Sequence, residues 1–149
     1  MKLEEEIKQT NFRNEYHKLA INIIFSHNWL MCLQSDIFNC FGITANQFNI
    51  LRILRGQFPK PATINLLKER MMDKMCDASR LVERLRIKGF IKRELSLDDR
   101  RRVDVIITDT GLNLLSEIDK LNSTQDALFH QLSSEETTLL NELLDKMRG

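Results

Sequence analysis

Residues 72–108 read MDKMCDASRLVERLRIKGFIKRELSLDDRRRVDVIIT, and this stretch decides the fold. Its apolar residues recur at helical spacing as far as Lys88, and Gly89 then ends the helix. Two runs rich in strand-forming residues follow at 90–95 and 103–107, joined by a turn that is almost wholly charged. The stretch therefore predicts a helix followed by a β-hairpin.

A shorter helix is predicted just before this one. Thr63 can cap a helix from Ile64 to about Met71, and residues 72–74 make a brief turn before the longer helix. Two short helices across such a turn form a helix-turn-helix, and a hairpin after it makes a winged helix. The apolar residues predicted to form the buried side of the longer helix are Met75, Ala78, Leu81, Val82 and Leu85.

An apolar helix precedes this region. Residues 12–41 carry an apolar stripe at helical spacing that ends at Gly42, and Thr44 with Gln47 then has the capping-box spacing of a further helix. A helix that is apolar over so much of its circumference must be covered on more than one side. The pattern therefore favours a partner subunit.

Two more helices are predicted after the hairpin. Thr108 can cap a long helix from Thr110 towards His130, and Ser133 with Glu136 has the capping-box spacing of a Leu-rich last helix. The predicted fold class is thus mainly α with a small β-hairpin wing. It is a winged helix-turn-helix domain with N- and C-terminal dimerisation helices.

Charge is unevenly distributed along the chain. Residues 68–102 hold twelve basic and seven acidic side chains, a net charge of +5, although the whole chain carries only +1. Residues 103–149 hold three basic and nine acidic side chains, a net charge of −6. This asymmetry is expected of a protein that meets a polyanion with one face.

Composition and motifs narrow the class of protein. A chain of 149 residues with 42% hydrophobic content fits one folded domain, and its three cysteines suggest free thiols. No apolar run approaches the roughly 20 residues of a membrane span, and MKLEEEIKQT is no secretory signal, so we expect a cytoplasmic location. With no catalytic or phosphate-loop motif, and no metal-ligand spacing around His17, His27 or His130, we expect no enzyme, cofactor or metal.

The longer helix carries the candidate binding residues. Asp77, Arg80 and Arg84 lie at steps of three and four, so they are predicted to share one face, opposite Leu81 and Leu85. Arginine binds phosphate and can pair bidentately with guanine, which is worth roughly 1–3 kcal/mol of discrimination. A solvated helix face is the plainer interpretation, and the charged hairpin that follows makes it the weaker one.

These elements, in this order, resemble the MarR family of bacterial transcriptional regulators over nearly the whole chain. The resemblance is strongest in SRLVERLRIKGFIKRE at 79–94 and DDRRRVDVIITDTG at 98–111. Residues 74–78, KMCDA, depart from it because they lack the usual Ser and Thr, and Ile107 replaces the usual leucine before Thr108.

The resemblance implies a homodimeric, sequence-specific regulator of transcription that binds a palindromic double-stranded DNA operator. It implies a recognition helix in the major groove, and a wing in which Asp99 orients Arg101 towards the minor groove between phosphate-binding neighbours. The DNA-binding residues expected on these grounds are Lys74, Cys76, Asp77, Ser79, Arg80, Arg84, Asp99, Arg100, Arg101 and Arg102.

The resemblance also assigns roles to the flanks of a single domain at 1–149. Residues at about 1–41 and 110–149 would dimerise, and about 44–109 would bind DNA. The residues expected at the dimer interface are Phe12, Tyr16, Leu139, Leu140, Leu143 and Leu144. A small aromatic or phenolic effector is a weaker expectation, in a pocket lined by Tyr16, His27, Trp29, Phe41 and Phe48.

Two alternatives remain open at this level. The winged helix could serve as a protein-interaction module, in which case replacing Arg101 would leave the complex intact. A redox-sensing regulator could instead use Cys76, beside Lys74 and a helix N-terminus.

Overall fold

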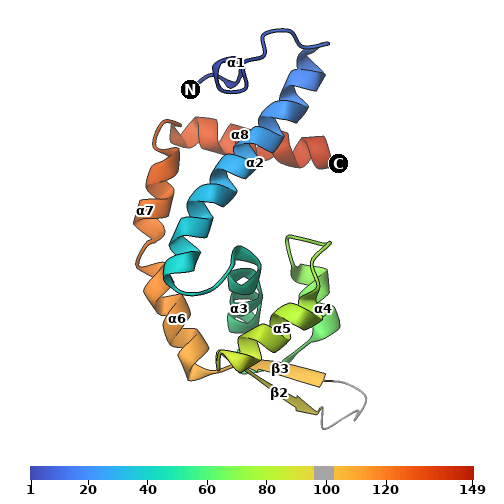
Figure 1. Cartoon of the computed structure of the whole chain (residues 1–149), viewed down its shortest axis with the longest axis vertical. Helices are drawn as coiled ribbons and strands as arrows, with labels where there is room; N and C mark the ends of the chain where they lie inside the picture. The colour runs from blue at the N-terminus through green and yellow to red at the C-terminus, as the bar shows by residue number, and fades with distance from the viewer. Residues whose placement is uncertain (96–102) are drawn as a thin grey trace.

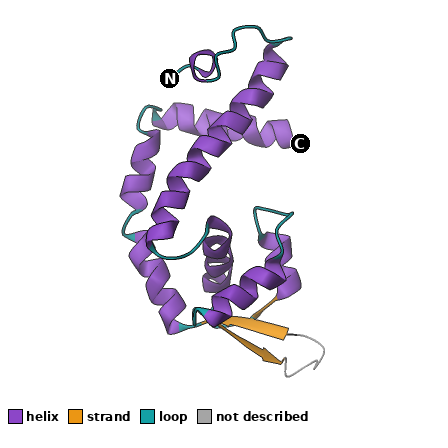
Figure 2. Ribbon diagram, viewed as in Figure 1, coloured by secondary structure: helices purple, strands orange, loops and turns teal. Residues whose placement is uncertain are grey.

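The computed structural model describes residues 1–95 and 103–149. Most of the described chain is helical, with one small sheet, and the molecule is elongated (Figures 1 and 2). The elements in chain order are α1 (Leu3–Glu6), α2 (Glu15–Cys40), α3 (Ala45–Gln57), β1 (Ala62–Thr63), α4 (Ile64–Arg70), α5 (Ala78–Ile87), β2 (Ile91–Leu95), β3 (Val103–Ile107), α6 (Asp109–Asp119), α7 (Asn122–Asp126), the 3-10 turn η1 (Ala127–Phe129) and α8 (Ser134–Arg148).

Four predicted helix starts, those of α3, α4, α6 and α8, are confirmed by their caps. Thr44 and Gln47 form both hydrogen bonds of a capping box at the start of α3, and Ser133 with Glu136 does the same for α8. Thr63 and Thr108 each accept a backbone N–H of the first turn of α4 and α6. These side chains satisfy amide groups that the helix itself leaves without partners.

A core of apolar side chains holds the winged helix together. It is built where α3, α4, α5 and α6 meet one face of the sheet, in the lower part of Figure 1. Fully burying one such side chain is worth roughly 1.5–3 kcal/mol. The residues with no exposed surface are Ile50, Leu51, Leu67, Ala78, Val82, Leu85, Val105, Leu115 and Ile118.

The hairpin lies in a three-stranded antiparallel sheet of order β1-β3-β2. The two predicted strands pair from Ile91 opposite Ile107 to Leu95 opposite Val103, as the alternating pattern requires. The short β1, which the sequence reading missed, pairs on the other edge of β3. The turn that joins β2 and β3, residues 96–102, lies outside the described residues.

The predicted long helix after Thr108 is wrong in its length. It ends at Asp119, and the chain continues as the short α7 and a 3-10 turn. The break falls at Lys120 and Leu121, directly before Asn122-Ser123-Thr124 at the start of α7, three residues whose side chains compete for backbone hydrogen bonds and so disfavour the interior of a long helix.

The predicted start of the longer helix is wrong as well. The sequence pattern begins it after residue 74 with Met75 buried, whereas α5 begins at Ala78 and Met75 is 94% exposed. Asp73 accepts the backbone N–H of Met75, and Asp77 accepts that of Arg80. These two bonds turn the chain before residue 78, and Asp77 becomes the N-cap.

The outer helices bury little against their own chain. Phe38 is the one buried residue of the 26-residue α2 within the described chain, and α8 buries none against it. Leu139, Leu140 and Leu143 are each about half exposed, at 54%, 45% and 52%.

In the described ranges, no helix has the length and apolar character that a membrane crossing requires.

Gly111 provides a test of how closely α6 approaches the sheet. A Cβ at this position would lie 2.4 Å from the carbonyl oxygen of Phe90 and 2.7 Å from a side-chain carbon of Ile107. Because backbone must move to make room, Gly111→Ala is expected to lower the free energy of unfolding by about 1–3 kcal/mol in urea denaturation.

Gly56, inside α3, is the matched control because a Cβ there meets no atom within 4 Å. Gly56→Ala is expected to be neutral or to stabilise by up to about 1 kcal/mol. Equal effects of the two substitutions would contradict the close approach at Gly111.

Candidate nucleic-acid interface

Helix α5 has two sharply different sides. Ala78, Val82 and Leu85 have no exposed surface and fasten the helix to the core. Ser79, Arg80 and Arg84 are exposed. Since the buried residues leave the helix no freedom to rotate, the two arginines are fixed on the solvent side.

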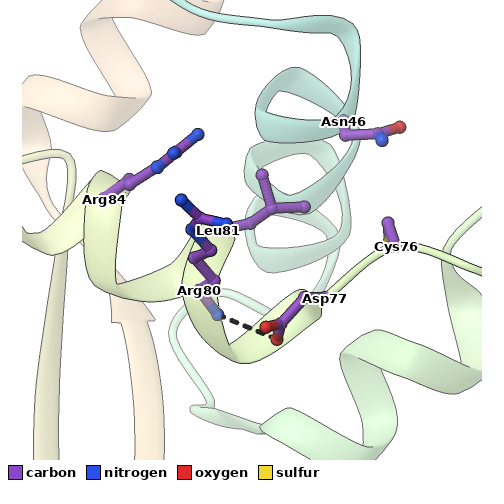
Figure 3. A pocket seen from close by; sticks show the side chains of 6 residues that line it. All are labelled: Asn46, Cys76, Asp77, Arg80, Leu81 and Arg84. Atoms are coloured by element: carbon purple, nitrogen blue, oxygen red, sulfur yellow. Dashed lines mark hydrogen bonds between the residues drawn. The ribbon is translucent and has the colours of Figure 1, made fainter.

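The exposed side of α5 borders a shallow hollow of about 200 Å³. In Figure 3 the side chains of Arg80, Leu81 and Arg84 extend from α5 on the side where α3 begins, and Asp77 caps the helix. Leu81, which was predicted to lie opposite the arginines, packs partly against the core and also lines this hollow beside them. The residues that line this α5 hollow are Asn46, Cys76, Asp77, Arg80, Leu81 and Arg84.

The segment between α4 and α5, residues 71–77, is called here the recognition loop, and α3 holds it in place. Asn46 donates to the carboxylate of Asp73 at 3.0 Å, and Asn49 accepts the backbone N–H of Met72 at 3.0 Å. The other carboxylate oxygen of Asp73 accepts the N–H of Met75 at 3.0 Å.

Asn46 and Asn49 were missed in the sequence reading. They lie three residues apart on α3, so a shared face was readable, but their partners lie 27 and 23 residues further along the chain. The Asp73 turn did carry a local signal, since Asp often accepts a backbone N–H two residues on.

Lys74, Cys76 and Asp77 were predicted in the first turn of the recognition helix, and they precede it instead. Lys74 donates to the backbone carbonyl of Glu69, which holds its ammonium against the end of α4. Asp77 uses its carboxylate as the N-cap of α5. Their places in the loop differ from the predicted ones, although Cys76 and Asp77 still line the α5 hollow.

Cys76 has the surroundings of an unreactive thiol. It is half-buried, and its Sγ donates to the backbone carbonyl of Asp73 at 3.0 Å. Burial raises the pKa of the Cys76 thiol, and the neighbouring charge of Asp73 raises it further. Because the thiolate is the reactive form, these surroundings disfavour the redox-sensing alternative.

Glu83 forms ion pairs with two arginines that do not line the α5 hollow. Its carboxylate accepts from Arg86 at 2.7 Å and from Arg93 of β2 at 3.0 Å. The hydrogen bond from Arg86, with that from Arg93, lowers the pKa of Glu83 from its ordinary 4.5 to about 2. Across residues 1–95 and 103–149, by contrast, neither Arg80 nor Arg84 forms an ion pair.

The four predicted wing residues, Asp99, Arg100, Arg101 and Arg102, lie outside the described residues. Strands β2 and β3 are described as far as Leu95 and Val103, which pair with each other. The wing residues therefore stay predictions.

The five aromatic residues predicted to line a ligand pocket are not brought together. Tyr16 and Phe41 stand at opposite ends of α2, about 38 Å apart at 1.5 Å per residue, and Tyr16 is 83% exposed. Phe48 stacks on Phe38 with ring centroids 4.5 Å apart. His27 and Trp29 are exposed on α2.

Among the predicted dimerisation residues, Phe12 makes an aromatic contact within its own chain. Its ring lies edge-on to His17, with 6.1 Å between the ring centroids. Tyr16, Leu139, Leu140 and Leu143 are exposed and Leu144 is half-buried.

The described residues contain no cluster of three or more metal-ligating side chains.

The Glu83 ion pairs predict a pH dependence of stability. A carboxylate with a folded pKa of about 2 and an ordinary pKa of 4.5 stabilises the fold above pH 4.5 and loses that effect towards pH 2. Glu83→Gln should therefore lower the melting temperature near pH 6 by no more than about 3 °C, since the pairs are exposed. The melting curves of variant and wild type should converge as the pH falls.

Glu142→Gln on α8 is the control, because Glu142 forms no ion pair within the described chain. It is expected to follow the wild type throughout. A difference between Glu83→Gln and wild type that stays constant from pH 6 to pH 2.5 would contradict the ion-pair network.

Comparison with known proteins places this geometry in a known fold. No family model matches the sequence. A mutant of MarR from E. coli, solved with operator DNA, is 24% identical over 93% of this chain and 99% of its own, with a TM-score of 0.80. Wild-type MarR from E. coli in its apo form is 25% identical over 87% and 96%, with a TM-score of 0.68.

The organohalide-sensing regulator RdhR, solved with bound 2,4-dichlorophenol, is 18% identical over 94% of this chain and 85% of its own, with a TM-score of 0.82. These structures are transcription regulators, and their folds match that of this chain over 87–94% of its length. In fold, the chain is a MarR-type winged-helix protein.

Proposed function

We propose that the protein is a regulator of transcription that binds double-stranded DNA sequence-specifically, as a homodimer on a palindromic operator. The observation that carries the proposal is the exposed side of α5. Arg80 and Arg84 project there without an ion-pair partner among the described residues, while the opposite side of the helix is wholly buried.

Arginines in this setting suit a DNA duplex. A helix of this size fits the major groove of B-form DNA, where arginine can donate two hydrogen bonds to guanine. Ser79, one residue earlier, adds a short hydroxyl that bonds either phosphate or base. Acids would repel phosphates at this surface, but the carboxylate of Asp77 accepts the Arg80 N–H and that of Asp73 accepts from Asn46 and Met75.

The wing extends the proposed interface. Asp99, Arg100, Arg101 and Arg102 follow β2, beyond the described residues, in the order that the family resemblance predicts. An arginine inserted into a narrow, A·T-rich minor groove gains from the concentrated negative potential there. The proposal assigns Arg101 to that groove and the flanking arginines to phosphates.

The outer helices support a dimer. Isolated helices of 15 residues are marginal in water, and helices in proteins are stabilised mainly by packing of an apolar side. Helix α8 has such a side, with Leu139, Leu140, Leu143 and Met147 about half exposed, yet it buries none of them against its own described chain. A second copy, packed through α8 and the exposed N-terminal part of α2 near Tyr16, would cover both.

The relatives add support without fixing the ligand. The E. coli mutant was solved on operator DNA, and its TM-score against this chain is higher than that of the apo protein. The RdhR structure holds 2,4-dichlorophenol, but the five aromatic residues predicted to bind such an effector in this chain do not lie together. The proposal therefore includes DNA and a second copy, and no effector site.

The test begins with duplexes selected from a random pool, whose affinities are then measured by fluorescence anisotropy at several salt concentrations. Wild-type affinity should fall linearly with the logarithm of the salt concentration, because phosphate contacts release counterions. Arg80→Ala should weaken binding about 10- to 100-fold and relax the preference at one base position.

Arg86→Ala is the matched control on the same helix, because Glu83 already holds that guanidinium. It should weaken binding less than about threefold. Equal losses in the two variants would contradict the assigned face of α5. If no duplex is selected at any salt concentration, the DNA-binding proposal is wrong, and the alternative of a protein-interaction module is favoured.

A further inference from the structure

The recognition loop exposes two methionines beside the proposed DNA surface. Met72 is 81% exposed and Met75 is 94% exposed, whereas Met71, at the start of the loop, is 1% exposed and anchors it in the core. Single exposed apolar side chains are ordinary on protein surfaces. Here two exposed methionines lie within four positions, shortly before a helix that presents two arginines, so they form part of the same surface as the proposed DNA contacts.

The backbone that carries Met75 is held from several directions. Its own N–H bonds to the carboxylate of Asp73, which is fixed in turn by the side-chain amide of Asn46 on α3. One residue on, the thiol of Cys76 donates to the carbonyl of Asp73. The exposure of Met75 is therefore imposed by the loop.

Met75 directly precedes two residues that line the α5 hollow. The two residues that follow it, Cys76 and Asp77, both line that hollow together with Arg80 and Arg84. Consecutive Cα atoms are 3.8 Å apart, so the Met75 side chain begins one residue from the lining of the hollow, and its length and flexibility let it reach a group bound next to Cys76.

The chemistry of the loop surface selects the kind of group that Met75 can read. Its side chain offers no strong hydrogen-bond donor and only a weak acceptor, so it cannot distinguish bases by polar contacts. The major groove presents one apolar group, the C5 methyl of thymine, which apolar side chains recognise by contact. The carboxylates of Asp73 and Asp77 keep their charge, but hydrogen bonds from Asn46 and from the backbone N–H groups of Met75 and Arg80 fix their orientation.

We propose that Met75 reads the C5 methyl of a thymine in each half-site, next to the base pair contacted by Arg80. The inference rests on the proposed DNA-binding function and deepens it. It makes the recognition loop a determinant of specificity, at the segment where the sequence departs from the family resemblance by lacking the usual Ser and Thr.

The test uses the duplex selected by the full-length wild-type protein. Each thymine is replaced in turn by deoxyuridine, which removes the methyl group and leaves every hydrogen-bonding atom in place. At one thymine per half-site, the replacement should weaken wild-type binding about fourfold, as expected for one methyl group returned to water. Met75→Ala should bind the thymine duplex about as weakly as wild type binds the deoxyuridine duplex, and should not distinguish the two.

Met72→Ala is the control from the same loop and should keep the full response to deoxyuridine. Both residues are exposed, so circular dichroism is expected to show unchanged folding in either variant. If wild type and Met75→Ala respond equally to every deoxyuridine, or if the response is lost in Met72→Ala instead, the assignment to Met75 is wrong while DNA binding stands. If the pool yields no bound duplex, both the inference and the proposed function fail.

Discussion

The burial of one side of α5 is the constraint on which the rest of the candidate site depends. Ala78, Val82 and Leu85 pack without exposed surface against a core that α3, α6 and β3 complete. That packing alone fixes Arg80 and Arg84 towards solvent, and no polar contact to either guanidinium is needed within the described chain. Specific recognition requires side chains that are already oriented before the duplex arrives, and here the apolar core supplies the orientation.

Each carboxylate around α5 has a different partner. Glu83 binds Arg86 and Arg93 on the flank of the helix, and Asp77 caps its first turn. Asp73 folds the loop against Asn46. Of these three acids, only Glu83 has cationic partners, whereas Asp73 and Asp77 are held by neutral hydrogen-bond donors. The surface left for a ligand combines the two arginines of α5 with the exposed methionines of the recognition loop, and the proposed function assigns these to phosphates, guanine edges and thymine methyl groups in one groove.

Local patterns predicted most of the fold, and contacts across the sequence account for the error at the start of α5. The caps at Thr44, Thr108 and Ser133 and the paired strands are set by neighbours within a few residues, so their spacing was sufficient. The start of α5 depends on the recognition loop, whose ties to α3 span more than 20 residues and leave no periodic signal. Of the site residues, Ser79, Arg80 and Arg84 lie where predicted on α5. Leu81, predicted on the buried side, packs partly against the core and also borders the α5 hollow. The sequence pattern of one chain shows that α8 has an apolar side, but it does not show what covers that side. In the proposed dimer a second copy covers it.

In the proposed complex, two copies joined through the outer helices place two α5 helices in successive major grooves. Hydroxyl-radical footprinting of a selected duplex tests it most directly, with Leu143→Asp as the variant that disrupts the apolar side of α8 and Asn141→Asp as the control of equal charge. With this dimer we expect two protected regions centred about 10 base pairs apart for wild type and for Asn141→Asp. Leu143→Asp should lose both regions at the same protein concentration. A single protected region at saturating wild-type protein, or an unchanged footprint with Leu143→Asp, would contradict it.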